Sequence, residues 1–130
     1  MANSISLRKS TITIFYIMIT NTLLQINNFG MGQGDESLGL KLINNYFNLI
    51  INDEQYPQFV VFYNSGVKLL TQNSLVVDSL KKLAEAGVQL IACKTCIEHY
   101  QISLPLPVGI AGSMIDIISL QQKAEKIITL

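Results

Sequence analysis

The sequence predicts an α/β fold in which helices cover both faces of a mostly parallel sheet. The unbroken apolar run Phe59–Tyr63 is typical of a strand that is buried on both faces, and the mostly apolar run Val88–Ala92 predicts a second strand. Segments with helical periodicity lie between and after these runs, so strands and helices alternate along the chain. The length of 130 residues suits one domain with one core. We therefore expect a single three-layer domain.

Residues 1–21 are expected to form an N-terminal arm or an extra strand in front of an α/β domain over residues 22–130. Arg8 and Lys9 precede the apolar run Ile12–Ile19, as in a signal peptide, but threonines interrupt the run and no cleavage site of small residues follows it. The run is also shorter than the roughly 20 apolar residues that span a membrane. We predict neither secretion nor membrane insertion from it.

The first strand of the domain ends in Leu23–Ile26, and a loop with three spaced glycines follows over residues 27–35. Apolar residues then recur at helical spacing over residues 36–51, with polar residues on the opposite side, which predicts an amphipathic helix. The buried strand Phe59–Tyr63 comes next. Asn64–Lys68 after it has the composition of a turn.

The middle of the chain predicts a second helix, a third strand and a short third helix. Asn73 or Ser74 is expected to cap a helix over about residues 74–86. The strand Val88–Ala92 leads directly to Cys93, and residues 94–101 are expected to form the short helix.

The C-terminal part predicts one more strand, helix and strand. Two prolines mark a loop in front of a strand at Val108–Ile110. Ser113 is expected to cap a helix that runs to about Ala124. Lys126–Leu130 closes the domain as the final strand.

The composition excludes several classes of function. Only 14% of the residues are charged, 49% are hydrophobic, and the formal net charge is zero. Mean hydropathy is +0.37. Such a chain is not disordered, and it lacks the positive field with which proteins bind nucleic acid. The apolar surplus predicts that copies of the chain cover part of one another's surface.

Cys93 and Cys96 are the most informative residues, and the chain has no other cysteine. Their spacing cannot staple distant segments, so the pair indicates redox, sulfur or metal chemistry in the reducing cytoplasm. At the end of a strand, Cys93 is expected to face the open edge of the sheet. The start of the next helix and Lys94 would stabilise its thiolate. The alternative is that both cysteines are small buried hydrophobic residues.

Ligands of parallel α/β sheets bind at the carboxyl ends of the strands. The loops expected there span residues 28–36, 64–68 and 93–99. We predict a site in which Cys93 and Cys96 react, lined by neighbouring residues in the three loops: Lys94, Thr95, His99, Gly32, Gly34, Asp35, Asn64 and Gly66.

Metal and phosphate sites are not expected among these loops. His99, three residues after Cys96, could accept a thiol proton, although an ordinary structural histidine is the alternative. With both cysteines it would supply only three ligands, whereas a structural zinc takes four. The glycines of the first loop have the spacing G-x-G-x-G instead of G-x-G-x-x-G, and Asp35 and Glu36 would repel a phosphate. We predict no cofactor.

Four segments together resemble a known family. They are GMGQGDESLG (30–39), VVFYNSGVKLLT (60–71), GVQLIACKTC (87–96) and VGIAGSMIDIISLQQKAEKIITL (108–130). In these segments the chain is similar to the DsrE/DsrF-like family, and most of all to its branch represented by the C-terminal domain of YedF. The resemblance covers about residues 22–130.

The resemblance implies a sheet of about five parallel strands, a homo-oligomer (dimer, trimer or hexamer), and sulfur relay through a cysteine persulfide. Cys93 matches the reactive cysteine of the sulfur-carrying members, and Cys96 matches the second cysteine of the YedF-like branch. That branch is associated with selenium metabolism. Its members usually carry a TusA-like domain where this chain has residues 1–21, so the resemblance implies a separate TusA-like sulfur-carrier partner.

Three functions remain open at this stage. The first is a small sulfurtransferase-like carrier that relays sulfane sulfur on Cys93. The second is a thiol–disulfide redox module that uses Cys93 and Cys96. The third is a catalytically inactive oligomeric binding protein in which both cysteines are residual.

Overall fold

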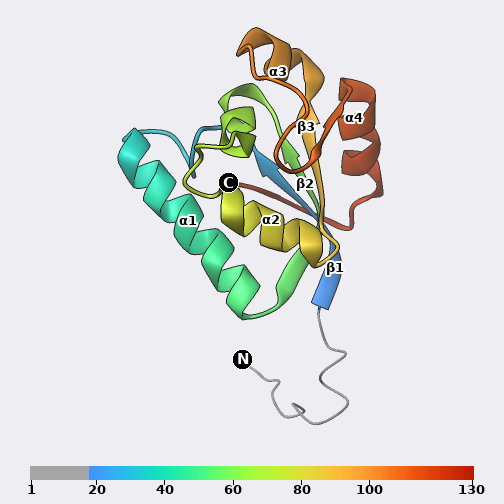
Figure 1. Cartoon of the computed structure of the whole chain (residues 1–130). Helices are drawn as coiled ribbons and strands as arrows, with labels where there is room; N and C mark the ends of the chain where they lie inside the picture. Colours follow the sequence, from blue (N-terminus) through green and yellow to red (C-terminus); the bar gives the residue numbers. More distant parts are fainter. Residues whose placement is uncertain (1–17) are drawn as a thin grey trace.

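The computed structural model describes residues 18–130, and it confirms the predicted α/β fold (Figure 1). Five parallel strands form one sheet: β1 (Met18–Ile26), β2 (Gln55–Phe62), β3 (Gln89–Cys93), β4 (Ile110–Gly112) and β5 (Lys126–Thr129). The helices are α1 (Glu36–Asn52), the 3₁₀ helix η2 (Asn64–Leu70), α2 (Val77–Glu85), α3 (Lys94–His99) and α4 (Met114–Lys123). The predicted N-terminal arm lies mostly outside the described residues, and its last residues, 18–21, belong to β1.

The strand order β4-β3-β2-β1-β5 explains the placement of the helices. The chain proceeds from β1 through β2 and β3 to β4, and then returns through α4 to place β5 on the other side of β1. Because crossovers between parallel strands are right-handed, this reversal puts α4 on the face opposite to α1 and α2. Figure 1 shows α4 on one side of the sheet and helices α1 and α2 on the other.

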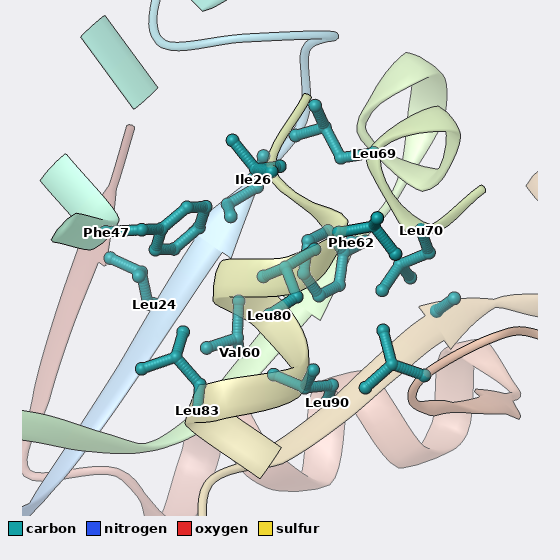
Figure 2. Packing of buried hydrophobic residues seen from close by; sticks show 14 of the residues in the cluster. Leu24, Ile26, Phe47, Val60, Phe62, Leu69, Leu70, Leu80, Leu83 and Leu90 are labelled. Carbon is teal, nitrogen blue, oxygen red and sulfur yellow. The ribbon is translucent and has the colours of Figure 1, made fainter. Parts of the chain in front are cut away.

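The larger core lies between the sheet and the helices α1, α2 and η2 (Figure 2). Alternate strand residues such as Leu24, Val60 and Leu90 point to this face, and Phe47 of α1 and Leu80 of α2 pack on them. Fully burying a leucine or phenylalanine side chain stabilises a fold by roughly 1.5–3 kcal/mol. This face therefore supplies most of the hydrophobic stabilisation.

The smaller core lies on the opposite face, under α4. It contains the other set of alternating strand residues and one helix residue: Leu23, Val61, Ile91, Cys93 and Ile117. Beside it, the buried side chain of Gln25 on β1 accepts a hydrogen bond from Gln121 of α4 and donates one to Thr129 of β5. These bonds satisfy a polar group that would otherwise destabilise this face.

Two predicted boundaries in the middle of the chain are wrong. The segment after β2 is not a simple turn but the 3₁₀ helix η2, which extends to Leu70. Neither Asn73 nor Ser74 caps α2, because that helix begins only at Val77 with Val76 as its N-cap. The Ser74 hydroxyl instead accepts the backbone N–H of Val76 in the preceding turn, at 3.2 Å.

Smaller differences have local backbone causes. Helix α3 ends at His99 instead of residue 101, because Gln101 adopts a left-handed conformation with φ 55°. β4 begins at Ile110, two residues later than expected, after Gly109 with φ 83°. The helix at residues 36–51, the cap at Ser113 and the last strand are confirmed within one or two residues.

Candidate functional site at the carboxyl edge of the sheet

Three neighbouring strands end at the edge of the sheet where the sequence predicts a site. β1, β2 and β3 end at Ile26, Phe62 and Cys93. In the sheet, Ile26 is paired with Phe62, and Phe62 is paired with Ala92, the residue before Cys93. The segments that follow are the glycine loop, η2 and α3. Helices η2 and α3 pack against each other over this edge.

Cys93 lies at the end of β3. Contrary to the expectation from the sequence, it does not face the open edge of the sheet. Its side chain belongs to the smaller core and only 3% of the residue is exposed. Side chains alternate along a strand, so Cys93 points to the same face as Ile91, toward α4. It also occupies the N-cap position of α3, without a side-chain hydrogen bond to that helix.

Cys96 lies in the first turn of α3 and is half-buried between the two cores. The backbone N–H of Asn64 donates a hydrogen bond to its Sγ at 3.1 Å. Burial and a hydrogen bond with the Cys93 thiol raise the pKa of Cys96, whereas the N–H of Asn64 acts in the opposite direction. The structure thus joins Cys93, Cys96 and Asn64 in one cluster.

Asn64 is the predicted site residue whose contribution was least apparent from the sequence. It has a left-handed backbone with φ 51°, and its exposed side chain accepts a hydrogen bond from the Tyr100 hydroxyl at 3.2 Å. The Lys68 ammonium lies 4.5 Å from the centre of the Tyr100 ring. Sequence reasoning missed both Tyr100 and Lys68. The available signal was the spacing of four residues from Cys96 to Tyr100, which puts both on one side of a helix.

Gly66 is required by close packing and not only by a turn. A Cβ atom built at this buried residue would overlap the carbonyl oxygen of Ile26 at the end of β1. The absence of a side chain therefore lets η2 lie directly on β1. The N–H of Gly66 bonds the carbonyl of Tyr63 at 3.0 Å, and the N–H of Tyr63 bonds the carbonyl of Ile26 at 3.1 Å. These contacts fix the backbone on both sides of Asn64.

The other predicted residues of α3 lie on the surface. Lys94, Thr95 and His99 are exposed. The ring of His99 packs edge-on against Tyr100, with 4.9 Å between the ring centres. Within residues 18–130 it makes no hydrogen bond to a cysteine sulfur, so the structure does not place it as the proton acceptor of Cys96.

Gly32, Gly34 and Asp35 are not brought to the cysteines. Figure 1 shows the start of α1 and helix α3 on opposite sides of the sheet's carboxyl edge. An added Cβ at either glycine would meet nothing within 4 Å. Asp35 caps α1, because its carboxylate accepts the backbone N–H of Leu38 at 2.8 Å and the hydroxyl of Ser37 at 2.7 Å. These bonds, that of Ser37 first, hold its pKa below the ordinary value.

Two open hollows are lined by neither cysteine. One, of about 280 Å³, lies beside α4 and is lined by Phe59, Gln89, Ile91, Ile110, Ala111, Gly112, Asp116, Ser119 and Leu120. The other, of about 240 Å³, lies near the amino ends of β1 and β2 under α1. In the described part of the chain, no three His, Cys, Asp or Glu residues are grouped to hold a metal ion. No helix in that part is long and apolar enough to cross a membrane.

Comparison with known proteins places this geometry in a family. The model of the DsrE/DsrF-like family matches residues 22–130. The crystal structure of the YchN protein from E. coli superposes with a TM-score of 0.60 at 22% identity, over 87% of this chain and 100% of that one. A protein of unknown function from Methanobacterium thermoautotrophicum, MTH1491, gives a TM-score of 0.60 at 24% identity, over 84% and 97%. No curated protein sequence matches the chain.

Proposed function

The chain belongs to the DsrE/DsrF-like family, which is associated with sulfur relay, and from this premise we propose that it is a small sulfurtransferase-like carrier of sulfane sulfur. Cys93 holds the sulfur as a persulfide, and Cys96 is the thiol through which it arrives and leaves. The observation that carries the proposal is the cluster of Cys93, Cys96 and the N–H of Asn64 at the carboxyl edge.

The unequal burial of the two thiols supports this division of roles. Cys96 is half-buried and reachable, and a backbone N–H at its sulfur favours the thiolate, which is the nucleophilic form. Cys93 is buried among apolar side chains, where a persulfide is shielded from water and thiol reductants. Cys96 packs against the smaller core that contains Cys93, and this proximity supports a direct transfer from one thiol to the other.

The chemistry needs no oxidant. The Cys96 thiolate attacks the terminal sulfur of a donor persulfide; a new S–S bond forms on Cys96 as the donor's S–S bond breaks, and the donor leaves as a thiolate. The Cys93 thiolate then attacks the terminal sulfur of the Cys96 persulfide in the same way, and Cys96 leaves as a thiolate. The reverse of these two steps delivers the sulfur to an acceptor thiol.

Loading with a protein-bound persulfide, followed by intact-mass measurement, tests the proposal. The wild-type chain is expected to gain the mass of one sulfur atom, and peptide mapping after alkylation is expected to find it on Cys93. Cys93→Ser should lose the stable adduct. Cys96→Ser should load much more slowly, because the donor must then reach a buried thiol.

Ser65→Ala is a matched control, since it changes a hydroxyl near Asn64 and leaves both cysteines in place. It is expected to load as the wild type does. If Cys93→Ser retains as much sulfur as the wild type, Cys93 is not the carrier and the assignment is wrong.

The contact between the two thiols also favours a second function, a thiol–disulfide redox module. Here an oxidant such as glutathione disulfide accepts two electrons, Cys93 and Cys96 form an S–S bond, and two glutathione thiols are released. Equilibration in glutathione buffers distinguishes the two functions. A reversible Cys93–Cys96 disulfide supports the redox module, whereas a pair that stays reduced across the series rules it out. A chain that neither loads sulfur nor oxidises would be the inactive binding protein.

Members of this family form oligomers, and we propose that this chain is a cytoplasmic homo-oligomer that receives its sulfur from a TusA-like carrier protein. Two free cysteines and no disulfide among the described residues support a reducing compartment.

A link to selenium is tested by loading with selenodiglutathione. One glutathione thiolate should leave as a selenium-bearing adduct forms on the same cysteine.

A further inference from the structure

We propose that Tyr100 is a positioning residue for Cys96: its hydroxyl holds Asn64 in the conformation that aims a backbone N–H at the Cys96 sulfur. The inference deepens the proposed function and rests on it for the role of Cys96 as the thiol that meets the donor. The geometry on which it stands is independent of that role.

The contacts form a closed circuit between two elements. Tyr100 lies one helical turn after Cys96, and its N–H bonds the Cys96 carbonyl at 3.0 Å, so both side chains lie on the side of α3 that faces η2. The Tyr100 hydroxyl donates to Asn64 Oδ1 at 3.2 Å. The Asn64 N–H donates to Cys96 Sγ at 3.1 Å, which returns the circuit to α3.

Asn64 needs such a restraint because of its backbone. Its φ of 51° lies in the left-handed region, which residues with a Cβ atom adopt at an energetic cost and asparagine tolerates better than most. The residue is exposed at the junction of β2 and η2, so no surrounding core holds its side chain. The bond from Tyr100 supplies that hold.

Tyr100 is itself held in place. Lys68 of η2 lies over its ring, and His99 packs edge-on against it. The cation on the ring also links η2 to α3 a second time, independently of the hydroxyl. Replacing the hydroxyl alone therefore leaves the ring and its packing partners in position.

The consequence for Cys96 is chemical. An N–H donor stabilises the thiolate more than the thiol, so it opposes the burial and the neighbouring Cys93 that raise the pKa of Cys96. Without it, a smaller fraction of Cys96 is nucleophilic at neutral pH. The titratable and charged groups on α3, on η2 and at the ends of β2 and β3 beside them are Cys93, Tyr63, Lys68, Lys94, Glu98, His99 and Tyr100.

The pH profile of Cys96 alkylation by iodoacetamide, followed by peptide mass spectrometry between pH 7.5 and 10.5, tests the inference. Tyr100→Phe is expected to raise the midpoint by roughly half to one pH unit, in line with the loss of one modest hydrogen bond. The rate at pH 7.5 should fall by roughly three- to tenfold.

Asn64→Gly separates positioning from a general structural effect. Glycine adopts a positive φ without help and keeps the N–H, so this variant should retain the wild-type profile. In the Asn64→Gly background, Tyr100→Phe should change nothing further. Asn64→Ala, which keeps the strain and loses the oxygen, should shift the midpoint upward as Tyr100→Phe does.

Two results would overturn the inference: an unchanged profile in Tyr100→Phe, or the same upward shift of Tyr100→Phe with glycine at position 64. The readout is thiol ionisation and not sulfur loading. A wild-type chain that takes up no sulfur, with the profiles as expected, would therefore refute the proposed function and leave the role of Tyr100 standing.

Discussion

The site depends on a position without a side chain as much as on the two thiols. Gly66 lets η2 lie against the carbonyl of Ile26, and η2 carries Asn64 to the Cys96 sulfur. A single methyl group added at residue 66 would therefore displace η2 from β1 and also disturb the hydrogen bond from Asn64 to the Cys96 sulfur. The same is not true of the exposed glycines in the loop before α1, which have open space around them.

Gly66→Ala is expected to destabilise the fold by about 1–3 kcal/mol, because its Cβ would overlap the backbone of β1 and η2 must move. Chemical denaturation measures the change. Gly39→Ala is the matched control, since a Cβ there would sit at an ordinary 3.4 Å from Met31 and would favour helix α1. That control should be neutral or stabilising. Equal losses in both variants would show that close packing at residue 66 is not the cause.

At the residue scale, sequence reasoning placed Cys93 at the end of a strand and Cys96 in the helix that follows, but it did not predict the direction in which Cys93 points. Cys93 and Ile91 are two residues apart on β3, so both face α4, and the parity of the strand contained that information. The bond from Asn64 to Cys96 joins residues 32 positions apart. Such a contact depends on how η2 meets α3, which no local pattern specifies.

Helix ends show why some elements were predicted better than others. Helices α1 and α4 begin with side-chain caps, Asp35 and Ser113, and both starts were evident from the sequence. Helix α2 begins without one, after a turn that uses Ser74 for another bond. A predicted boundary is therefore reliable where the capping oxygen has no competing backbone partner.

Asp35→Ala is expected to lower the melting temperature at pH 7, because two N-terminal donors of α1 lose their acceptor. The pKa of Asp35 is held below its ordinary value in the folded chain, so its stabilisation is fully present above the unfolded-state pKa near 4. It is lost as the pH falls through the folded-state pKa. The difference between variant and wild type should therefore close on acidification.

Asp35→Asn is the control for that experiment, since asparagine also caps helices but does not titrate. It should stay close to the wild type at pH 7 and become the more stable of the two on acidification, because only the wild-type carboxylate loses its stabilisation there. Thermal unfolding followed by circular dichroism across pH 3–7 provides the measurement. A gap between Asp35→Ala and the wild type that is constant over this range would contradict a carboxylate cap.

The whole molecule has two unequal faces. Helices α1, α2 and η2 cover one face with a large core, whereas α4 covers only part of the other and leaves the open hollow beside it. Next to that hollow lie exposed apolar side chains: Ile110, Met114, Ile115 and Ile118. Protruding side chains and a hollow on one face are what a symmetric contact between two copies requires. The low proportion of charged residues in the sequence is thus reflected in the exposed apolar side chains on the α4 face.

A contact between two copies at the α4 face would also affect the two cysteines. Gly112, which lines the hollow, pairs with Cys93 in the sheet. A copy bound over α4 would cover Cys93 further, because Cys93 lies in the core under α4. Cys96 and Tyr100 contact Asn64 of η2 instead, and this side of α3 would stay uncovered. The arrangement fits a carrier that stores sulfur on a covered thiol and exchanges it through an open one.

The double variant Ile115→Lys/Ile118→Lys is expected to convert the proposed homo-oligomer into monomers, because two charges would be buried at the contact. These residues are 78% and 46% exposed in the single chain, so the fold should remain intact. Sedimentation velocity gives the mass, and circular dichroism verifies the fold. Leu38→Lys/Leu49→Lys on α1 is the matched control, with exposures of 53% and 61%. If the α1 variant dissociates and the α4 variant does not, the copies meet through α1, and the cover over Cys93 must come from its own chain alone.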